Sequence, residues 1–294
     1  MINSIVDNEN KRYKICINFH NNDKLITSYT DTITHSDIIS IANKIIDYIR
    51  TLDTSIMFNY MIIQRTFNTG QIGVKFVFRY LNDDPYDLIK NIYSHICNYV
   101  TVCCYQWTTD NKSPKDDDNT KSFTNNQLTD ISDGVYWSYS INSFSQIYKE
   151  SSEEIHKIVN KEIIQSTNFI GIGGEMGYYA KANKDKFKNI SLFTNSQSIY
   201  NDSLKEKQIC ELVNYNIFEL DNYYRDDSVL LINISKNGLK RLAIQINKLN
   251  FKQIIYISCN SISLSKDLRI MTNYKTEIYH NIPNGRTVSI LHRI

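Results

Sequence analysis

The chain has 294 residues, of which 41% are hydrophobic and 22% charged, and its formal net charge is +2. This composition is typical of a globular protein with a large core and excludes a predominantly disordered chain. The near-neutral charge neither requires nor excludes a polyanionic partner. Abundant Asn, Ile, Lys and Tyr with only three prolines indicate an AT-rich genome, a viral one included.

No window of the sequence approaches the roughly 18 apolar residues that a membrane span requires, and the first residues lack the apolar core of a secretory signal. We therefore expect an intracellular, cytoplasmic protein without a membrane partner, in the host cytoplasm if the source is viral. No C-x-x-C spacing occurs, so reduced thiols are expected rather than disulfides or a metal site. The six cysteines are Cys16, Cys97, Cys103, Cys104, Cys210 and Cys259.

The first part of the chain mixes strand and helix patterns. Apolar residues at helical spacing predict a helix over 36–52, capped by Ser36 or Asp37. Two β-rich runs around Asn68, Thr69 and Gly70 predict a hairpin. A polar stretch over 110–129 predicts a surface loop. Further expected elements are strands at 13–19 and 99–109 and a helix at 84–96, which together indicate an α+β domain.

After the polar stretch the pattern becomes an alternation of strands and helices. A helix behind a serine cap is expected over 151–164, with Ile155, Ile158, Val159 and Ile163 on one face. Alternation of this kind predicts an α/β fold with a mostly parallel, doubly wound sheet. The expected strands lie within 169–182, 189–195, 227–235 and 252–260. We therefore expect an α+β domain over 1–135 and an α/β domain over 136–294.

A glycine-rich turn, with Gly171, Gly173, Gly174 and Gly177, joins an expected strand to an expected helix. Glycine lets the backbone approach a nucleotide closely, and a helix start supplies amide donors. A tight turn without a ligand explains the same glycines. A nucleotide site of this type normally continues with an acidic residue after the next strand, where this chain has Asn195.

Cys259 ends a β-branched apolar run and precedes a polar helix start. Most cysteines on strands are buried and inert. At the carboxyl end of a parallel strand, however, a side chain faces the crevice in which open α/β sheets bind ligands. A thiol there is a candidate nucleophile.

The segment IIYISCNSISLSKDL, residues 254–268, resembles the nucleophile motif of the S-adenosylmethionine-dependent RNA (uracil-5-)-methyltransferases. Residues 139–146, YSINSFSQ, are similar to a second motif of that family, and Gly171-Ile172-Gly173 is similar to its donor loop. The likeness covers about residues 60–294. It implies a Rossmann-like class I methyltransferase domain, S-adenosylmethionine as cofactor, tRNA or rRNA as partner, and methyl transfer to carbon 5 of a pyrimidine.

The resemblance also assigns roles to individual residues. Cys259 is implied as the nucleophile and Ser289 stands at the position of the general base. Asn233 stands where the family has a carboxylate that meets the uracil edge. The implied cofactor-binding residues are Gln146, Gly171, Gly173, Gly174 and Asn195, with Asn233 at the same pocket.

Three positions at which carboxylates are expected are neutral in this chain: Asn195, Asn233 and Ser289. A serine hydroxyl is a poor general base at neutral pH. His280 or His292 can replace it, or both are ordinary strand residues. Two functions follow: a divergent methyltransferase with impaired activity, or an inactive protein of the same fold that binds RNA or regulates a partner.

The first domain offers a weaker signal for RNA. Cations that alternate with aromatic residues suit phosphates and unstacked bases, although a strand that is half core and half solvated has the same pattern. The residues concerned are Arg65, Phe67, Lys75, Phe76, Phe78 and Arg79.

Overall fold

The structure is a computed structural model. It describes residues 11–12, 14–18, 20–21, 24–25, 33–52, 58–79, 81–109, 120–125, 127–206 and 208–294.

The chain forms two compact units. The first comprises residues 1–131, 138–142 and 147–149, and the second comprises 132–137, 143–146 and 150–294. The chain therefore passes between the units several times, and the expected boundary after residue 135 falls inside this interleaved segment.

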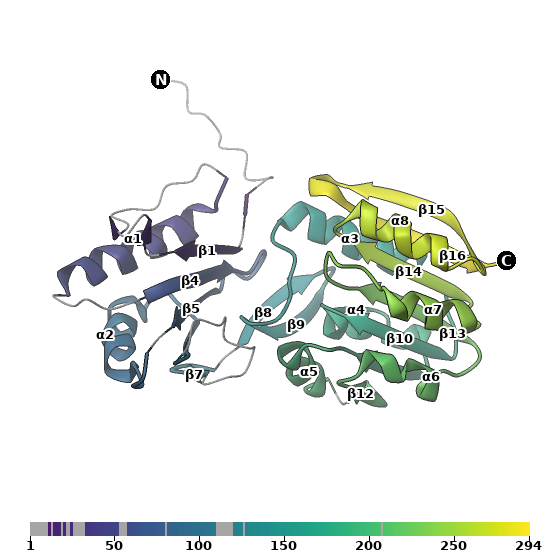
Figure 1. Ribbon diagram of the computed structural model, residues 1–294, viewed down its shortest axis with the longest axis horizontal. Helices are drawn as coiled ribbons and strands as arrows, with labels where there is room; N and C mark the ends of the chain where they lie inside the picture. The colour runs from purple at the N-terminus through teal and green to yellow at the C-terminus, as the bar shows by residue number, and fades with distance from the viewer. Residues whose placement is uncertain are drawn as a thin grey trace, which may run out of the picture. The chain divides into compact units, whose positions relative to one another are not determined.

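The first unit contains a five-stranded sheet in the order β1-β4-β5-β6-β7 (Figure 1). Helices α1 and α2 contribute their apolar stripes to one core with the strands. The strands are β1 (Lys14–Asn18), β4 (Phe58–Arg65), β5 (Ile72–Phe78), β6 (Val102–Trp107) and β7 (Lys121–Ser122), and the helices are α1 (Ser36–Thr51) and α2 (Tyr86–Ile96). The short pair β2 (His20–Asn21) and β3 (Lys24–Leu25) forms a sheet of its own.

These elements confirm the strands, helices and hairpin that the sequence predicts in this region. The cap of α1 is different: His35 precedes the helix, and its Nδ1 accepts a hydrogen bond from the backbone N of Asp37 at 3.2 Å. The prediction of Ser36 or Asp37 as the cap is therefore wrong. Much of the expected loop over 110–129 lies outside the described residues, and β7 lies within it.

Strand β5 is buried along its whole length, on both of its faces. Phe76 and Phe78 are core residues, and Lys75 is buried with its Nζ 2.6 Å from Oδ1 of Asn142. Arg65 pairs with Asp37 at 2.8 Å. For Lys75, Phe76 and Phe78, both the prediction of an RNA-facing row and the alternative of a half-solvated strand are therefore wrong. One face of β5 packs into the core with α1 and α2, and Leu128 and Ile141 lie against the other face at Gly73. For Arg65, Phe67 and Arg79, which are partly exposed, contact with RNA stays a prediction.

The second unit contains a seven-stranded sheet in the order β12-β11-β10-β13-β14-β16-β15. The five strands from β12 to β14 run parallel, and β16 and β15 add two antiparallel strands at one edge. This confirms the mostly parallel α/β sheet. The strands are β10 (Asn168–Gly173), β11 (Asn189–Phe193), β12 (Leu212–Asn214), β13 (Ser228–Asn233), β14 (Gln253–Ser258), β15 (Tyr274–Ile282) and β16 (Arg286–Arg293). A separate two-stranded sheet pairs β8 (Gln127–Ser132) with β9 (Val135–Ser140).

Helices lie on both faces of this sheet. Alternate strand residues such as Ile232 and Tyr256 share a core with α7 and α8. On the opposite face, a Cβ on Gly171 would lie 2.6 Å from Sδ of Met176 in α4. The helices are α3 (Lys149–Glu162), α4 (Met176–Ala182), α5 (Gln197–Leu204), α6 (Leu220–Tyr223), α7 (Arg241–Lys248) and α8 (Ser261–Ile270), with single 3-10 turns at Lys184–Lys186, Ile217–Glu219 and Pro283–Gly285.

Helix α3 buries the predicted apolar face, including Ile155 and Val159. It begins two residues earlier than expected, so Ser151 and Ser152 lie inside the helix and are buried. The prediction of a serine cap for α3 is therefore wrong. Within the described ranges, every helix is too short or too polar to cross a membrane.

Candidate active site

The order of the parallel strands reverses between β10 and β13. From β10 the chain builds β11 and then β12 toward one edge, whereas β13 and β14 extend the sheet the other way. Open α/β sheets bind ligands at such a switch point, beside the carboxyl ends of the strands. The turn after β10 and the ends of β13 and β14 therefore define the candidate site.

The glycine turn packs tightly against β13. Gly173 has a φ of +103°, and a Cβ there would overlap the backbone oxygen of Asn233. The backbone N of Gly174 donates to that same oxygen at 2.8 Å. A Cβ on Gly174 would lie 2.5 Å from the ring of Phe144. Packing within the chain thus requires glycine at both positions, and the amide of Gly174 is not a free donor.

A buried carboxyl, Glu175, joins the predicted site residues. Its Oε1 accepts a hydrogen bond from the backbone N of Gln146 at 3.1 Å, and its Oε2 accepts one from Nδ2 of Asn233 at 3.2 Å. The same Nδ2 donates to the backbone oxygen of Gly174 at 3.1 Å. The structure therefore brings Gln146, Gly174 and Asn233 together around a residue that the sequence analysis missed.

Glu175 has an unusual backbone conformation and an unusual pKa. Its φ of +59° is left-handed, a conformation that costs an ordinary residue about 1–2 kcal/mol. Burial raises the pKa of its carboxyl to about 7, against hydrogen bonds from Gln146 and Asn233 and the charge of Arg286, which lower it. Near neutral pH, both the ionised and the protonated form are therefore populated.

Arg286, the first residue of β16, extends this network. Its Nε donates to Oε1 of Gln146 at 2.8 Å, and one of its terminal nitrogens donates to the backbone oxygen of Asn284 at 2.9 Å. The side chain of Gln146 in turn contributes a hydrogen bond that lowers the pKa of Glu175. A continuous polar chain thus runs from Arg286 through Gln146 and Glu175 to Asn233.

Cys259 lies directly after β14 and is exposed. Next to it, Asn260 caps α8, and its Oδ1 accepts hydrogen bonds from the backbone N of Ile262 at 3.0 Å and of Ser263 at 3.3 Å. Ser258 Oγ accepts from the backbone N of Asn260 at 3.1 Å. The thiol therefore projects from a turn that is hydrogen-bonded on both sides, and the alternative of a sealed core cysteine is wrong.

Asp267 in α8 fastens the loop after β13 to the region of the thiol. Its Oδ2 accepts from the backbone N of Leu239 and from the hydroxyl of Tyr256, both at 2.7 Å. The side chains of Asn260 and Ser263 donate to the backbone oxygen of Lys236 at 3.1 and 2.8 Å. The ends of β13 and β14 are thereby held in one arrangement.

Asn195 lies in the turn after β11 and is exposed. Its Oδ1 accepts a hydrogen bond from the backbone N of Ile217 at 3.1 Å. It occupies the strand end at which a ribose-binding carboxylate is expected, and it offers an amide there. The hydrogen bonds of the described residues do not join it to the network of Glu175.

Ser289 lies inside β16 and is fully buried, opposite Tyr256 and Tyr279. Its Oγ has no hydrogen-bond partner among the described residues. Leu291, two positions further on, belongs to the core with α7 and α8, so Ser289 faces those helices. Its hydroxyl is therefore buried between the sheet and those helices, whereas Cys259 is exposed.

The two candidate replacement bases lie on the antiparallel strands. His292 follows Leu291, which pairs with Ile254 at the start of β14. Because Cys259 lies five residues beyond Ile254, the two ends are about 16 Å apart along the strand. His292 therefore lies at the opposite end of the strands from Cys259, as expected if it is an ordinary strand residue. His280 pairs with Val288, nearer the carboxyl edge.

Sequence reasoning missed Glu175, Arg286 and the role of Asp267. An acidic residue inside a glycine turn, directly before an apolar helix, is a signal that marks Glu175. Arg286 has no comparable local signal, since its partner Gln146 is far away in the sequence.

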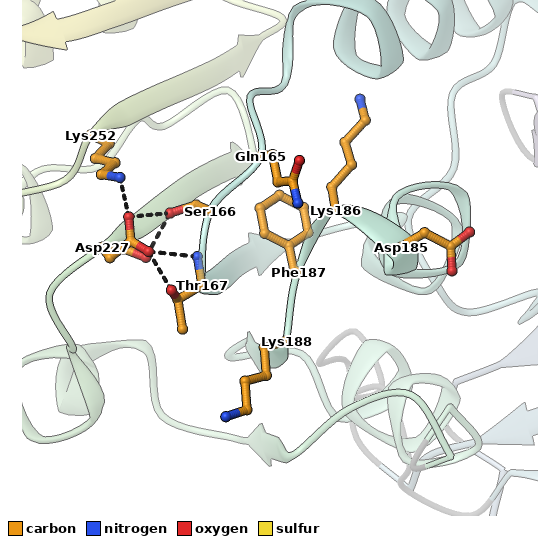
Figure 2. Close-up of a pocket in the computed structure, with 9 residues that line it drawn as sticks. All are labelled: Gln165, Ser166, Thr167, Asp185, Lys186, Phe187, Lys188, Asp227 and Lys252. Atoms are coloured by element: carbon orange, nitrogen blue, oxygen red, sulfur yellow. Dashed lines mark hydrogen bonds and ion pairs between the residues drawn. The ribbon is translucent and has the colours of Figure 1, made fainter.

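A cavity of about 540 Å³ lies where the parallel strands begin, at the end of the sheet opposite the candidate site. Figure 2 shows Lys252, Ser166 and Thr167 converging on the carboxylate of Asp227. Hydrogen bonds from Lys252 and Thr167 hold the pKa of Asp227 below its usual range. These contacts join the starts of β10, β13 and β14, at the end of the strands opposite Cys259.

The fold of the second unit is of the class I methyltransferase type. The structure of the Pyrococcus abyssi tRNA (uracil-54, C5)-methyltransferase in complex with S-adenosyl-L-homocysteine matches 96% of this chain and 76% of that one, with a TM-score of 0.71 and 14% identity. That likeness shows the fold. No model of a known protein family matches the chain.

Two curated proteins are similar in sequence. A 23S rRNA (uracil(747)-C(5))-methyltransferase of Actinobacillus pleuropneumoniae is 26% identical over 137 residues, 42% of this chain and 35% of that protein. A putative enzyme of the same name from Haemophilus ducreyi is 28% identical over 141 residues, 42% of this chain and 66% of that protein. The chain thus spans less than two thirds of either relative. The chain is thus similar to RNA (uracil-5-)-methyltransferases, in sequence over 42% of its length and in fold over 96%.

Proposed function

We propose that the protein transfers a methyl group from S-adenosylmethionine to carbon 5 of a pyrimidine in RNA, with Cys259 as the nucleophile. The observation that carries this proposal is the exposed thiol at the carboxyl end of β14, two strands from the glycine turn in the sheet order. A thiol held at the end of a rigid strand is accessible to a base, whereas a buried one is not.

The chemistry requires a covalent step. Carbon 5 of uracil is a weak nucleophile, so the sulfur of Cys259 adds to carbon 6 and the electron pair moves to form an enolate. S-adenosylmethionine supplies an electrophilic methyl group for carbon 5. Loss of the proton from carbon 5 then restores the double bond and releases the thiol.

The residues at the switch point suit the cofactor and the base. The glycine turn, Phe144 and Gln146 line the end of β10, where the class I fold holds its donor, and Asn195 stands at the end of β11. Asn233 ends β13 between the glycine turn and the strand of the thiol, which suits a residue that contacts the pyrimidine.

We propose tRNA or rRNA as the partner, because the relatives that match in sequence and in fold are named for these RNAs. A base that is stacked and paired inside a duplex does not present carbon 6 to a thiol of the protein, so the target is a flipped or looped nucleotide. The row of β5 takes no part in this contact, since it is buried.

The test is incorporation of labelled methyl groups from S-adenosylmethionine into total tRNA and rRNA. We expect incorporation by the wild type, its loss in Cys259→Ala, and retention in Cys97→Ala, which removes an exposed thiol of the first unit. No incorporation into either RNA pool would remove the proposal.

The burial of Ser289 favours a second candidate, a protein that keeps the fold and the pocket but lacks turnover. If Cys259 adds to the base and nothing removes the proton, a covalent RNA adduct accumulates. Denaturing gels separate the two: a stable adduct without methylated product supports the second candidate, and clean turnover contradicts it.

A further inference from the structure

The amide group of Asn233 has no unused donor. An asparagine side chain carries two N–H bonds and one acceptor oxygen. In this structure Nδ2 donates to the backbone oxygen of Gly174 at 3.1 Å and to Oε2 of Glu175 at 3.2 Å. Oδ1 accepts no hydrogen bond from the described residues. The acceptor is therefore what this side chain has left for a ligand.

This orientation of the amide follows from its two partners. The backbone oxygen of Gly174 is an acceptor in every protonation state, and the carboxyl of Glu175 has a second oxygen occupied by the backbone N of Gln146. A flipped amide would place Oδ1 against the backbone oxygen of Gly174, and against a second acceptor when Glu175 is ionised. It would also leave both N–H bonds without a partner among the described residues, which is costly in a buried site. Asn233 has only 3% of its surface exposed, so water compensates little for these losses.

We propose that Glu175 is a positioning residue that holds Asn233 as a hydrogen-bond acceptor toward the bound pyrimidine. The proposal rests on the proposed function, because it takes Asn233 as the residue that meets the base. The amide then presents the same polarity as the carboxylate that the family resemblance places at this position. An acceptor here pairs with the N3–H of uracil and opposes the lone pair at N3 of cytosine.

The proposal also accounts for the missing carboxylate. An aspartate at position 233 would lie within hydrogen-bonding distance of Glu175, and two buried carboxylates this close cannot both ionise. In this chain the buried carboxyl, Glu175, lies on the glycine turn, and its partner on β13 is the amide of Asn233. Glu175 and Asn233 are therefore a matched pair, in which the acid and the amide are exchangeable only together.

The first test is a cycle of Glu175→Gln, Asn233→Asp and the double variant, followed by thermal unfolding at pH 8. Asn233→Asp alone is expected to lower the melting temperature by about 5 °C, because it adds a second buried carboxyl. In the double variant the amide introduced on the glycine turn donates to the carboxylate introduced on β13, so part of that loss is expected to be recovered, while the contact with the backbone oxygen of Gly174 stays lost. Melting temperatures that fall additively would overturn the pairing.

The second test measures how the site reads the base. The probes are two short single-stranded RNAs that differ by one uridine or cytidine, titrated in the presence of S-adenosylhomocysteine. The wild type is expected to prefer uridine. Glu175→Gln is expected to reduce the preference about tenfold, because its amide can donate to Oδ1 of Asn233 and lets that side chain flip. The double variant should regain it. Glu154→Gln, at an exposed acid on α3, is the matched control.

The two tests fail in different ways. An unchanged base preference in Glu175→Gln, with wild-type binding intact, would overturn the positioning role. If the wild type binds neither RNA and incorporates no methyl group, the proposed function fails and the base-reading role fails with it. The unfolding cycle decides the pairing of Glu175 with Asn233 independently of RNA.

Discussion

Nε of Arg286 donates a hydrogen bond to Oε1 of Gln146 at 2.8 Å, although the two residues are 140 positions apart in the chain. Gln146 also contacts Glu175 through its backbone N. Arg286 therefore orients one side chain of the switch-point cluster and lowers the pKa of another.

Arg286→Ala is expected to weaken the binding of S-adenosylmethionine about tenfold, because a hydrogen bond from a charged group contributes about 1.5–3 kcal/mol. Calorimetric titration measures the change. Arg293→Ala is the control, since Arg293 lies on the same strand and bonds to the backbone oxygen of Leu249 instead. Equal affinities for Arg286→Ala and the wild type would show that Gln146 does not depend on this contact.

Gly173→Ala is expected to destabilise the protein by more than about 2 kcal/mol, since the methyl group adds a clash with β13 to the strain of a positive φ. Gly285→Ala is the control: its φ is +71°, but no heavy atom lies within 4 Å of the added Cβ. Urea unfolding of both variants separates the clash from the backbone strain. A similar loss in the two variants would contradict the close approach of Gly173 to Asn233.

Thiol labelling of the native protein is expected to follow burial. Cys259 and Cys97 are exposed, and burial raises the pKa of both Cys104 and Cys210 to about 12, so the first pair reacts early and the second only after unfolding. Iodoacetamide with peptide mapping by mass spectrometry gives the order. Protection of Cys259 without added ligand would argue against it as a nucleophile.

The stability of the wild type is expected to fall as the pH rises from about 4.5 to 7. Burial raises the pKa of Glu175 from 4.5 to about 7, so its ionisation costs more in the folded state than in the unfolded state. The resulting loss of stability, of the order of 3 kcal/mol, is complete above pH 7 and absent below pH 4.5. The charge of Arg286 lowers this pKa, while Tyr179 is the other titratable group that faces the carboxyl.

Glu175→Gln removes the ionisable group, so its stability is expected to lose this pH-dependent component while the rest of the titration remains. Chemical denaturation at a series of pH values between 4 and 8 compares the variant with the wild type. Parallel curves for the two proteins would show that Glu175 ionises as freely in the folded state as in the unfolded one.

The sequence predicted four of the five parallel strands of the second unit, β10, β11, β13 and β14, because each is an apolar run that ends in polar residues. It missed β12, which is three residues long and only partly buried. It also placed Cys259 at a strand end, and the structure leaves that thiol exposed. These features are local: a strand of six buried residues and its terminus can be recognised without knowing its neighbours.

Features that depend on neighbours were missed. The row of Lys75, Phe76 and Phe78 alternates like a half-exposed strand, but α1 and α2 pack on one face of β5, and Leu128 and Ile141 lie against the other. The predictions of the two helix caps were wrong. His35 caps α1 with an imidazole nitrogen, and α3 begins before the serines that were expected to cap it. Glu175 became visible as a site residue only when the fold brought Asn233 and Gln146 to it.

The carboxylate of Asp267 holds the backbone of Leu239 and the hydroxyl of Tyr256 at once. A substrate that displaces the loop after β13 must therefore also disturb the contact beneath α8, close to the thiol. One carboxylate thus keeps the loop after β13 and the strand beneath α8 in place beside a thiol that is already exposed.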